Sequence, residues 1–338
     1  RMRKSVERIH PKRMQLRLIG YKDETSDTRT YRFERTDAAL PPFRPGQYVN
    51  LFVTVAGVRT SRPYSISSAP GKPWIELTVR RKSGGFVTSH LFEGLDLGDA
   101  VESSGPVGSF YHEPLIDGES LAFLAGGSGI TPFIAMLRHF DASGAFDSGL
   151  RVLLLYGVRT PDDAAFLDEL KDLEERHAGF DLTLVVSEPE KGYRGTTGLL
   201  DRVRLRRSIR GLGSKRYYLC GPTPMLDLCT EGLTQLRVPQ HRIRRELFGP
   251  PDDITSTPAW PADLSPDARF SVRVGDRAPF EAKASESLLN AMERQGIVTP
   301  ATCRSGSCSA CRVKLVSGEV VMPPSTGLRE ADLALGYI

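Results

Sequence analysis

The stretch LAFLAGGSGITPFIAMLRHF, residues 121–140, has the pattern of a buried strand, a glycine-rich turn and then a helix. The turn contains three glycines, Gly126, Gly127 and Gly129. Such glycines let the backbone approach a dinucleotide closely, and the pair Thr131–Pro132 suits the first turn of a helix. The usual GxGxxG fingerprint is absent, so a plain strand-to-helix turn stays open as the alternative.

The residues that follow repeat this alternation of apolar strands and amphipathic helices. The segments are RVLLLYGV (151–158), AAFLDELKDLEERH (164–177), DLTLVVSE (181–188), RYYLCG (216–221) and TPMLDLCTEGLTQLRV (223–238). Alternation of this kind predicts a parallel sheet that helices cover on both faces.

Cys220 lies at the end of one of these strands and is followed by Gly221 and Pro222. Open α/β sheets bind ligands beyond the carboxyl ends of their strands. The Cys220 thiol is therefore a candidate for contact with a bound nucleotide. A buried structural cysteine is the alternative, and we adopt that interpretation for Cys229 in the next helix.

Upstream, residues 14–114 are rich in short alternating segments that Gly and Pro interrupt. They include QLRLIGY, TRTYRF, QYVNLFVTV and WIELTVR. This pattern predicts small antiparallel strands that close into a barrel.

One expected barrel strand carries RPYSISSAP, residues 62–70. Strand alternation puts Arg62 and Tyr64 on one face and Ser65 on the other. An Arg beside an aromatic ring suits a ligand with a phosphate at one end and a flat ring at the other. A surface Arg stacked on a strand Tyr is the alternative.

Two further glycine turns lie in the same region. KSGGFVTSHL, residues 82–91, places a glycine pair before helix-forming residues, with the Thr88 hydroxyl near the helix start. Backbone N–H groups at such a start bind phosphate oxygens. GPVGSF, residues 105–110, supplies the second turn. A double glycine by itself is weak support for a ligand site.

Near the carboxyl end, CRSGSCSACRVKLVSGEV (303–320) spaces Cys303, Cys308 and Cys311 as C-x4-C-x2-C. This spacing matches the plant-type [2Fe–2S] pattern, and Ser305, Gly306 and Ser307 suit a loop whose N–H groups point at sulfur. Zinc is the competing metal, but it usually takes paired Cys or His residues. No His follows His241, and three structural thiols are the remaining alternative.

Length and composition indicate several domains in a globular chain. The 338 residues exceed one ordinary core. Five prolines mark residues 249–268 as a semi-rigid tether. The net charge of +4 comes from residues 1–13, which hold six Lys or Arg against one Glu and are expected to be a solvated tail. Five cysteines form no disulfide framework and favour the cytoplasm.

With the motifs in this order, the sequence resembles the ferredoxin–NADP reductase superfamily from about residue 14 to 249. RPYS resembles its flavin motif, KSGGFVT its pyrophosphate motif, GGSGITP its pyridine-nucleotide motif and CGP its nicotinamide-side motif. The last 70 or so residues resemble a plant-type ferredoxin in the cysteine spacing, the hairpin FSVRVGDRAPFEA and the helix SESLLNAMERQG.

This resemblance implies a role for each position. Arg62 would hold the flavin pyrophosphate, Tyr64 would pack on the flavin and Ser65 would lie near its reactive nitrogen. Glu246 and Phe248 would close the nicotinamide side, and Ser65, Cys220 and Glu246 would position and polarise the reactants. The other implied cofactor-binding residues are Pro63, Gly85, Val87, Thr88, Gly126, Gly127, Gly129, Thr131, Pro132, Gly221 and Pro222.

The resemblance also implies the cofactors and the domains. GPVGSF and the GG-x-V-T pattern favour FAD over FMN. NADH is favoured over NADPH because Glu188 would repel a 2′-phosphate, although Arg159, Lys191 and Arg194 could reverse this preference. We expect a multidomain β, α/β and α+β chain. Its parts are a basic tail (1–13), an antiparallel FAD-binding β-barrel (14–115), a Rossmann-like parallel NAD(P)-binding α/β domain (116–249), a Pro-rich linker (250–267) and a β-grasp [2Fe–2S] domain (268–338).

The implied function is an NAD(P)H-dependent reductase. A hydride would pass to FAD, and single electrons would then pass through the [2Fe–2S] cluster to an oxygenase, hydroxylase or demethylase. The alternatives are a redox-sensing flavo-iron–sulfur protein and a reductase for a hybrid-cluster or other anaerobic acceptor. The fourth cluster ligand is expected beyond Ile338, and the natural start before Arg1.

We expect a cytoplasmic monomer without nucleic acid or a membrane span. No run of about 18 apolar residues occurs in the sequence. The basic segment DRVRLRRSIRGLGSKR (201–216) could dock an acidic partner, and a solvated face is the alternative.

Overall fold

A computed structural model describes residue 7 and residues 9–249, 253–257, 259–322 and 327–338. Part of the predicted tail and part of the predicted linker therefore lie outside the described residues. The chain divides into two compact units. One runs up to Leu51 and from Tyr64 to Glu246, and the other comprises Phe52–Pro63 and Leu247–Ile338.

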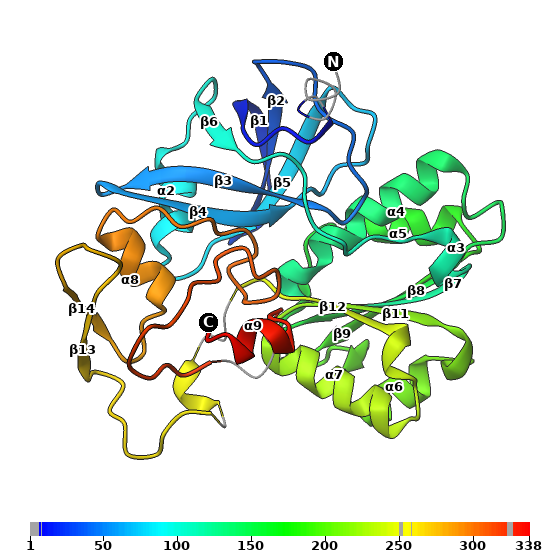
Figure 1. Cartoon of the computed structure of the whole chain (residues 1–338). Helices are drawn as coiled ribbons and strands as arrows, with labels where there is room; N and C mark the ends of the chain where they lie inside the picture. The colour runs from blue at the N-terminus through cyan, green and yellow to red at the C-terminus, as the bar shows by residue number, and fades with distance from the viewer. Residues whose placement is uncertain (1–6, 8, 250–252, 258, 323–326) are drawn as a thin grey trace. The chain divides into compact units, whose positions relative to one another are not determined.

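The first sheet has six strands in the order β4-β3-β6-β1-β2-β5 (Figure 1). In β1 the buried residues alternate with exposed ones from Met14 to Leu18, as predicted. An antiparallel bridge between Ile66 and Leu77 joins the two ends of the sheet, so the strands close into the predicted barrel. The strands are β1 Met14–Thr25, β2 Thr28–Arg35, β3 Tyr48–Val55, β4 Val58–Ser65, β5 Trp74–Arg80 and β6 Ala100–Ser103, and helix α2 is Phe86–Gly94.

The second sheet is parallel, with the order β10-β9-β8-β7-β11-β12. In Figure 1, α4 and α5 cover one of its faces and α6 and α7 the other, which confirms the predicted α/β arrangement. The strands are β7 Ser120–Gly126, β8 Arg151–Val158, β9 Phe180–Val186, β10 Thr196–Thr197, β11 Arg216–Cys220 and β12 Ile243–Glu246. The helices are α3 Pro114–Asp117, α4 Thr131–Ser143, α5 Leu167–Arg176, α6 Arg202–Ser208 and α7 Thr223–Gln235.

Aromatic side chains fill the core between this sheet and α4. The Phe123 and Phe133 rings stack with their centroids 4.6 Å apart, and Tyr218 meets Phe123 edge-on at 5.6 Å. Such pairs add to the stabilisation that burial alone provides. This core holds the start of α4 firmly against β7 and β11.

One predicted helix differs from the structure in where it begins. The helix expected from residue 164 begins at Leu167, because Phe166 has a left-handed backbone with φ 62° that interrupts the helical geometry. The basic segment 201–216 contains a helix, α6, whose cap is Asp201 accepting the backbone N–H of Arg204 at 2.8 Å. Short 3-10 turns occur at Gly127–Ile130, Pro161–Asp163, Leu212–Ser214, Gln240–Arg242 and Ile254–Ser256.

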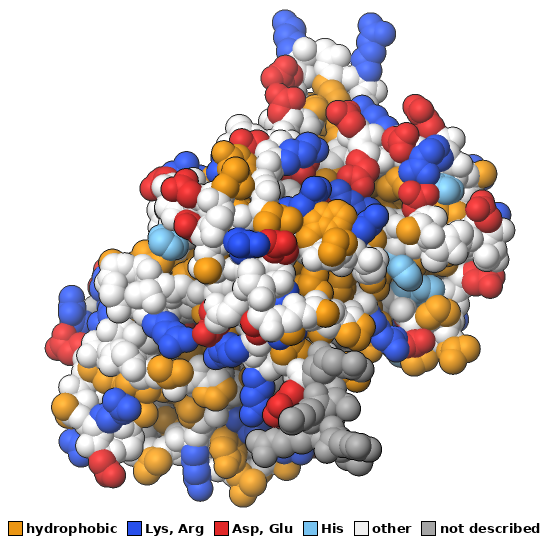
Figure 2. Space-filling view, turned by 90° about the horizontal axis from the view of Figure 1, so that it is seen from above, with side chains coloured by type: hydrophobic (Ala, Val, Ile, Leu, Met, Phe, Trp, Pro, Cys, Tyr) orange, Lys and Arg blue, Asp and Glu red, His pale blue; other side chains and the backbone are white. Residues whose placement is uncertain are grey.

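The carboxyl-terminal module contains the hairpin and helix expected of it. Strands β13 Arg269–Val272 and β14 Phe280–Lys283 pair in antiparallel register, and α8 Leu288–Arg294 follows. The Ser287 side chain caps α8 by accepting the Asn290 N–H at 3.2 Å. A last helix, α9, spans Glu330–Ala334. Across the described ranges, no helix has both the length and the apolar character needed to cross a bilayer. Basic and acidic side chains are interspersed on the face that Figure 2 draws.

Candidate redox sites

The predicted nucleotide residues meet at one edge of the parallel sheet. Strand β11 lies between β7 and β12. Cys220 is opposite Ala125 on one side and Glu246 on the other, so all three lie at the carboxyl ends of neighbouring strands. This is the edge where open α/β sheets bind their ligands. The structure therefore brings together the two motifs that the sequence separates by about 90 residues.

The glycine turn after β7 packs directly on the turn after β11. A Cβ atom on Gly129 would lie 2.1 Å from the Cys220 carbonyl oxygen, and one on Gly126 would lie 2.4 Å from the Met225 sulfur. Gly127 has φ 51°, which larger residues rarely adopt. Backbone atoms therefore exclude a side chain at Gly129, the φ angle disfavours one at Gly127, and Gly126 packs on the Met225 side chain, so the two turns are in close contact.

Helix α4 begins immediately after this turn. The Thr131 hydroxyl donates to the Ser128 carbonyl oxygen at 3.0 Å, and Pro132 stands in the first helical turn, where its missing N–H costs nothing. Both residues are buried. The start of α4 is thus fixed at the sheet edge, as the sequence predicts.

The Cys220 side chain is completely buried. Burial raises the pKa of its thiol well above the ordinary value, and the nearby Glu246 carboxylate raises it further. Cys220 is therefore a neutral thiol under ordinary conditions. A buried, protonated thiol is a poor nucleophile and a poor base, which favours a packing or positioning role for Cys220 at this edge.

The flavin motif occupies the end of β4. Arg62, Pro63 and Tyr64 are all half-buried and Ser65 is buried, so burial does not alternate residue by residue along this end of the strand. One nitrogen of Arg62, Nη1, donates to the Thr60 hydroxyl and to the Ser61 carbonyl oxygen, both at 2.7 Å. The boundary between the two compact units passes between Pro63 and Tyr64, inside this strand.

The pyrophosphate motif forms the start of α2. Gly85 is its cap residue and has no side chain that could accept the first N–H groups of the helix. A Cβ atom there would lie 2.3 Å from the Thr88 hydroxyl oxygen, which accepts the Lys82 N–H at 3.1 Å. Val87 is buried beneath the turn. Backbone N–H groups in this arrangement suit a phosphate group.

Phe248 lies two residues beyond Glu246 but in the other compact unit, and the residue is 44% exposed. Glu246 itself ends β12 and is half-buried.

The three cysteines of the carboxyl-terminal module lie in one strained loop. Cys303 is buried, Cys311 is half-buried and Cys308 is exposed. Arg304 and Ser309 have left-handed backbones with φ 55° and 53°, which non-glycine residues seldom adopt. The strained backbone is typical of a loop that wraps a ligand.

Hydrogen bonds in this loop favour thiolate sulfur at Cys303. The Ser305 N–H donates to the Cys303 Sγ at 3.4 Å, as the sequence predicts for a cluster loop. A hydrogen bond from the Cys308 thiol is the largest cause that lowers the pKa of Cys303, and hydrogen bonds from Ser305 and Ser307 lower it further. The same hydrogen bond between the two sulfurs raises the pKa of Cys308. Burial raises the pKa of Cys311. Metal binding requires deprotonated cysteines, so one ligand is already predisposed.

Within the described part of the chain, no three His, Cys, Asp or Glu side chains converge into a complete metal site. The structure brings Cys303 and Cys308 into direct contact, and Cys311 follows in the same loop. A set of soft thiols with backbone N–H groups directed at sulfur fits an iron–sulfur cluster and does not resemble the paired Cys and His ligands of zinc.

The sequence analysis missed a buried ion pair behind the cluster loop. The Arg304 guanidinium donates to both Glu293 carboxylate oxygens, at 2.7 and 2.8 Å, and to the Asn290 side-chain oxygen at 2.6 Å. Only 6% of the Arg304 side chain and 12% of the Glu293 side chain are exposed. The Thr60 hydroxyl also donates to Glu293 at 2.8 Å. No spacing in the sequence indicates these partners.

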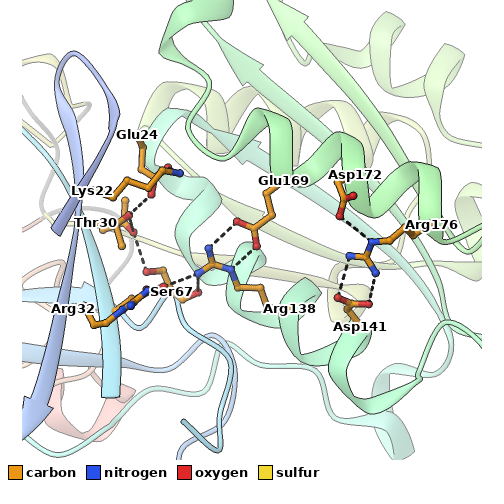
Figure 3. Close-up of polar contacts among 12 residues, drawn as sticks. Lys22, Glu24, Thr30, Arg32, Ser67, Arg138, Asp141, Glu169, Asp172 and Arg176 are labelled. Carbon is orange, nitrogen blue, oxygen red and sulfur yellow. Dashed lines mark hydrogen bonds and ion pairs between the residues drawn. The ribbon is translucent and has the colours of Figure 1, made fainter. Parts of the chain in front are cut away.

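A second missed group surrounds Arg138 in α4. Figure 3 shows its guanidinium between Glu169 of α5 and Ser67, the second residue after β4. Arg138 lies on a helix that the sequence predicts, but periodicity does not reveal a charged residue that makes buried contacts.

Comparison with known proteins gives three family matches in the predicted order. An oxidoreductase FAD-binding domain matches residues 15–112, an oxidoreductase NAD-binding domain matches 123–231 and a 2Fe-2S iron–sulfur cluster binding domain matches 272–338. These matches confirm FAD, a pyridine nucleotide and a [2Fe–2S] cluster as the cofactors.

Curated relatives match along nearly the whole chain. The glycine betaine monooxygenase reductase subunit of Chromohalobacter salexigens is 31% identical over 96% of this chain and 91% of its own. The stachydrine N-demethylase reductase subunit of Rhizobium meliloti is 28% identical over 93% and 89%. Among solved structures, phthalate dioxygenase reductase has a TM-score of 0.69 at 24% identity, covering 96% of this chain and 92% of that one, so the three-part fold is shared.

Proposed function

We propose that this member of the ferredoxin–NADP reductase superfamily reduces one specific oxygenase, hydroxylase or demethylase component. The chain belongs to the superfamily as a FAD-dependent oxidoreductase with a carboxyl-terminal plant-type [2Fe–2S] domain. The observation that carries this proposal is the full-length match to reductase subunits of such systems. The chain is an NAD(P)H-dependent electron-transfer reductase, and the proposal concerns the identity of the protein that accepts its electrons.

FAD, when bound, accepts a hydride from the nicotinamide and gives up electrons singly. The residues that would hold its diphosphate and ring are those of β4 and α2 described above, with Arg62 as the cation and the α2 N–H groups as donors. Ser65 would present its hydroxyl to the flavin from a buried position. Gly126, Gly129 and Cys220 would hold the nicotinamide nucleotide at the sheet edge.

The sequence also predicts the cofactor preference, and contacts of Arg159 support it. The Arg159 side chain is paired with Asp163, with Nε to Oδ2 at 3.4 Å, and its carbonyl oxygen accepts the Glu188 N–H at 2.8 Å. This pair partly neutralises the Arg159 charge, and the backbone contact puts Glu188, just after β9, beside Arg159, just after β8. A weakened cation and a neighbouring acidic residue would favour NADH over a cofactor that carries the extra negative charge of a 2′-phosphate. We therefore propose NADH as the physiological donor.

The domain limits given above, 14–115, 116–249 and 268–338, are likewise proposals, as is a monomeric, cytoplasmic protein that binds no nucleic acid. The location is supported by the cysteines, because none of the five, all of which lie within the described residues, forms a disulfide.

Anaerobic titration of the reconstituted holoprotein with NADH tests the function. We expect flavin bleaching followed by the electron paramagnetic resonance signal of a reduced [2Fe–2S] cluster. Adding a candidate oxygenase component and its substrate should then yield product in proportion to the NADH consumed.

A cluster that stays oxidised while the flavin is fully reduced would contradict electron transfer along this chain. Reduction of a hybrid-cluster protein with no oxygenase turnover would favour the alternative acceptor, for which the NADH oxidoreductase HCR of Escherichia coli is a relative 31% identical over 88% of this chain.

A further inference from the structure

The barrel closes immediately beyond the flavin motif. The Ser67 N–H donates to the Glu76 carbonyl oxygen at 2.8 Å, next to the bridge between Ile66 and Leu77. Ser67 is the second residue after Ser65, which ends β4. A displacement of the backbone at Ser67 would therefore be passed to the flavin motif through one residue, Ile66.

Arg138 contacts this closure point from the nucleotide domain. Its Nη1 donates to the Ser67 carbonyl oxygen at 2.8 Å and to Glu76 Oε2 at 2.9 Å. The rest of the guanidinium, Nε and Nη2, donates to the two carboxylate oxygens of Glu169 at 2.6 and 2.7 Å. One planar group therefore joins α4, α5 and the barrel, as Figure 3 shows.

The contacts are sheltered from solvent. The exposed fraction is 22% for the Arg138 side chain, 12% for Glu76 and 35% for Glu169. Arg138 also stacks 5.2 Å from the Phe166 ring centroid. Burial opposes the charge on Arg138, but the hydrogen bonds and charges of Glu169 and the charge of Glu76 outweigh it and raise the arginine pKa, so Arg138 stays a cation. The planar guanidinium directs several N–H donors at fixed angles, and a lysine ammonium group cannot reproduce this geometry.

Helix α4 begins at the turn where the nicotinamide nucleotide, the hydride donor, would bind. It starts at Thr131, directly after the glycine turn of the nucleotide site, and Arg138 is two helical turns further on. Hydride transfer requires the donor and acceptor atoms in near contact, and a displacement of about 1 Å can cost about 100-fold in rate. The rigid path from the nucleotide turn through α4 to Ser67 connects the two halves of the reaction.

Resting on the proposed function, we propose that Arg138 is a positioning residue for hydride transfer, which fixes the nucleotide helix α4 to the closure of the flavin barrel. Arg138 touches neither reactant motif directly. Its effect is exerted on the distance and angle between them.

Arg138→Met tests this role in the FAD- and cluster-loaded protein. In stopped-flow experiments with NADH, we expect the rate constant of flavin reduction to fall about 10- to 100-fold, with the Kd for NADH changed by less than about threefold. The isotope effect with 4-deuterated NADH should also change, because the approach geometry changes. Arg138→Lys should restore part of the rate, and Glu76→Gln should lower it in the same direction.

Arg176→Met is the matched control. Arg176 also bridges two carboxylates, Asp141 and Asp172, at 2.7 and 2.8 Å, but all three residues belong to the nucleotide domain, as Figure 3 shows. This variant should reduce its flavin at the normal rate. Hydrogen exchange over residues 66–70 should accelerate in Arg138→Met and stay unchanged in Arg176→Met, which gives a readout independent of catalysis.

Normal flavin reduction in Arg138→Met, or an equal loss in Arg176→Met, would overturn the positioning role. If Arg138→Met does not fold, Arg138→Lys and Glu76→Gln carry the same test, and normal rates in both overturn it. A wild-type flavin that NADH does not reduce would instead overturn the proposed function itself.

Discussion

At the scale of single residues, the nucleotide site depends on the absence of side chains. Gly129 lies against the Cys220 carbonyl group so closely that no Cβ atom fits. The sequence predicted that both residues belong to a nucleotide site. It could not predict that they touch, because contact between two turns depends on the order of strands in the sheet.

Gly129→Ala should therefore disturb the edge of the sheet. The new methyl group would overlap backbone atoms, which usually costs about 1–3 kcal/mol of unfolding free energy. We expect NADH-dependent flavin reduction to fall while bound FAD is retained, as measured by stopped-flow absorbance and by flavin content. Gly213→Ala is the control, because no heavy atom of the described residues, apart from its own chain neighbours, lies within 4 Å of its Cβ position. Equal activity in both variants would contradict the close packing.

The buried thiols give a pH prediction. Burial raises the pKa of Cys229 to about 12 and that of Cys220 well above its ordinary value. A raised pKa keeps both groups protonated at about pH 8–9, and the protonated thiol is a poor nucleophile. In the folded holoprotein, iodoacetamide at about pH 8.5 should leave both cysteines unmodified, as checked by peptide mass spectrometry. Unfolding in denaturant should expose them, and rapid labelling before unfolding would contradict their burial.

At the scale of helices and strands, the long elements were predictable and several of the short ones were not. Strands such as β1 and β8 carry enough apolar residues to show their period. Strands β6, β10 and β12 are two to four residues long and exist because a neighbouring strand offers hydrogen bonds. Tertiary pairing of this kind leaves no mark on a short stretch of sequence, which is why Glu246 was placed by resemblance alone.

The cluster loop and helix α8 form the second case in which an element depends on a remote partner. Glu293 in α8 binds Arg304 in the loop and accepts the hydroxyl hydrogen bond of Thr60 from the β3–β4 hairpin. The left-handed backbone of Arg304 costs energy, and the buried ion pair offsets it. The loop shape is therefore maintained by a carboxylate about ten residues away in sequence.

Glu293→Gln should loosen this loop. Removing one charge from a nearly buried ion pair costs about 3–5 kcal/mol, because the other charge stays buried. We expect the cluster absorbance to decay several-fold faster in the presence of an iron chelator.

Glu286→Gln in the same module is the control for this change. Its partner Arg294 is 46% exposed and the pair is at the surface, so its loss should cost at most about 1 kcal/mol. Equal cluster lifetimes in the two variants would show that the buried pair does not support the loop.

At the scale of the whole molecule, electrons enter in pairs at the barrel and leave singly through the iron–sulfur module. The order of the three parts was predictable from the motifs, because each motif has its own spacing. The division into compact units was not. The sequence suggests a boundary at the proline-rich linker, whereas the structure assigns the hairpin tip Phe52–Pro63 to the carboxyl-terminal unit. Hydrogen bonds such as that of Thr60 draw it there, and no local pattern encodes them.

Cys308→Ser separates the two stages of electron flow. The variant should lose its cluster, because a hydroxyl is a poor substitute for a thiolate ligand. NADH should still reduce the flavin and ferricyanide at normal rates, while transfer to cytochrome c and to an oxygenase component should drop at least about tenfold. Cys229→Ala, which removes a structural thiol, should keep the iron content and both activities. A normal rate of electron transfer from Cys308→Ser to the oxygenase component would show that electrons leave the protein by a route other than the cluster.

The membership of Phe52–Pro63 in the carboxyl-terminal unit matters to anyone who recombines such reductases. A chimera cut at the proline-rich linker would give the transplanted iron–sulfur module a foreign hairpin, and Glu293 would then lose the hydrogen bond from the Thr60 hydroxyl. A successful graft has to carry this hairpin along as a second, discontinuous donor fragment. Where evolution has exchanged only the carboxyl-terminal module between reductases, we accordingly expect matching substitutions in the barrel hairpin that contacts it.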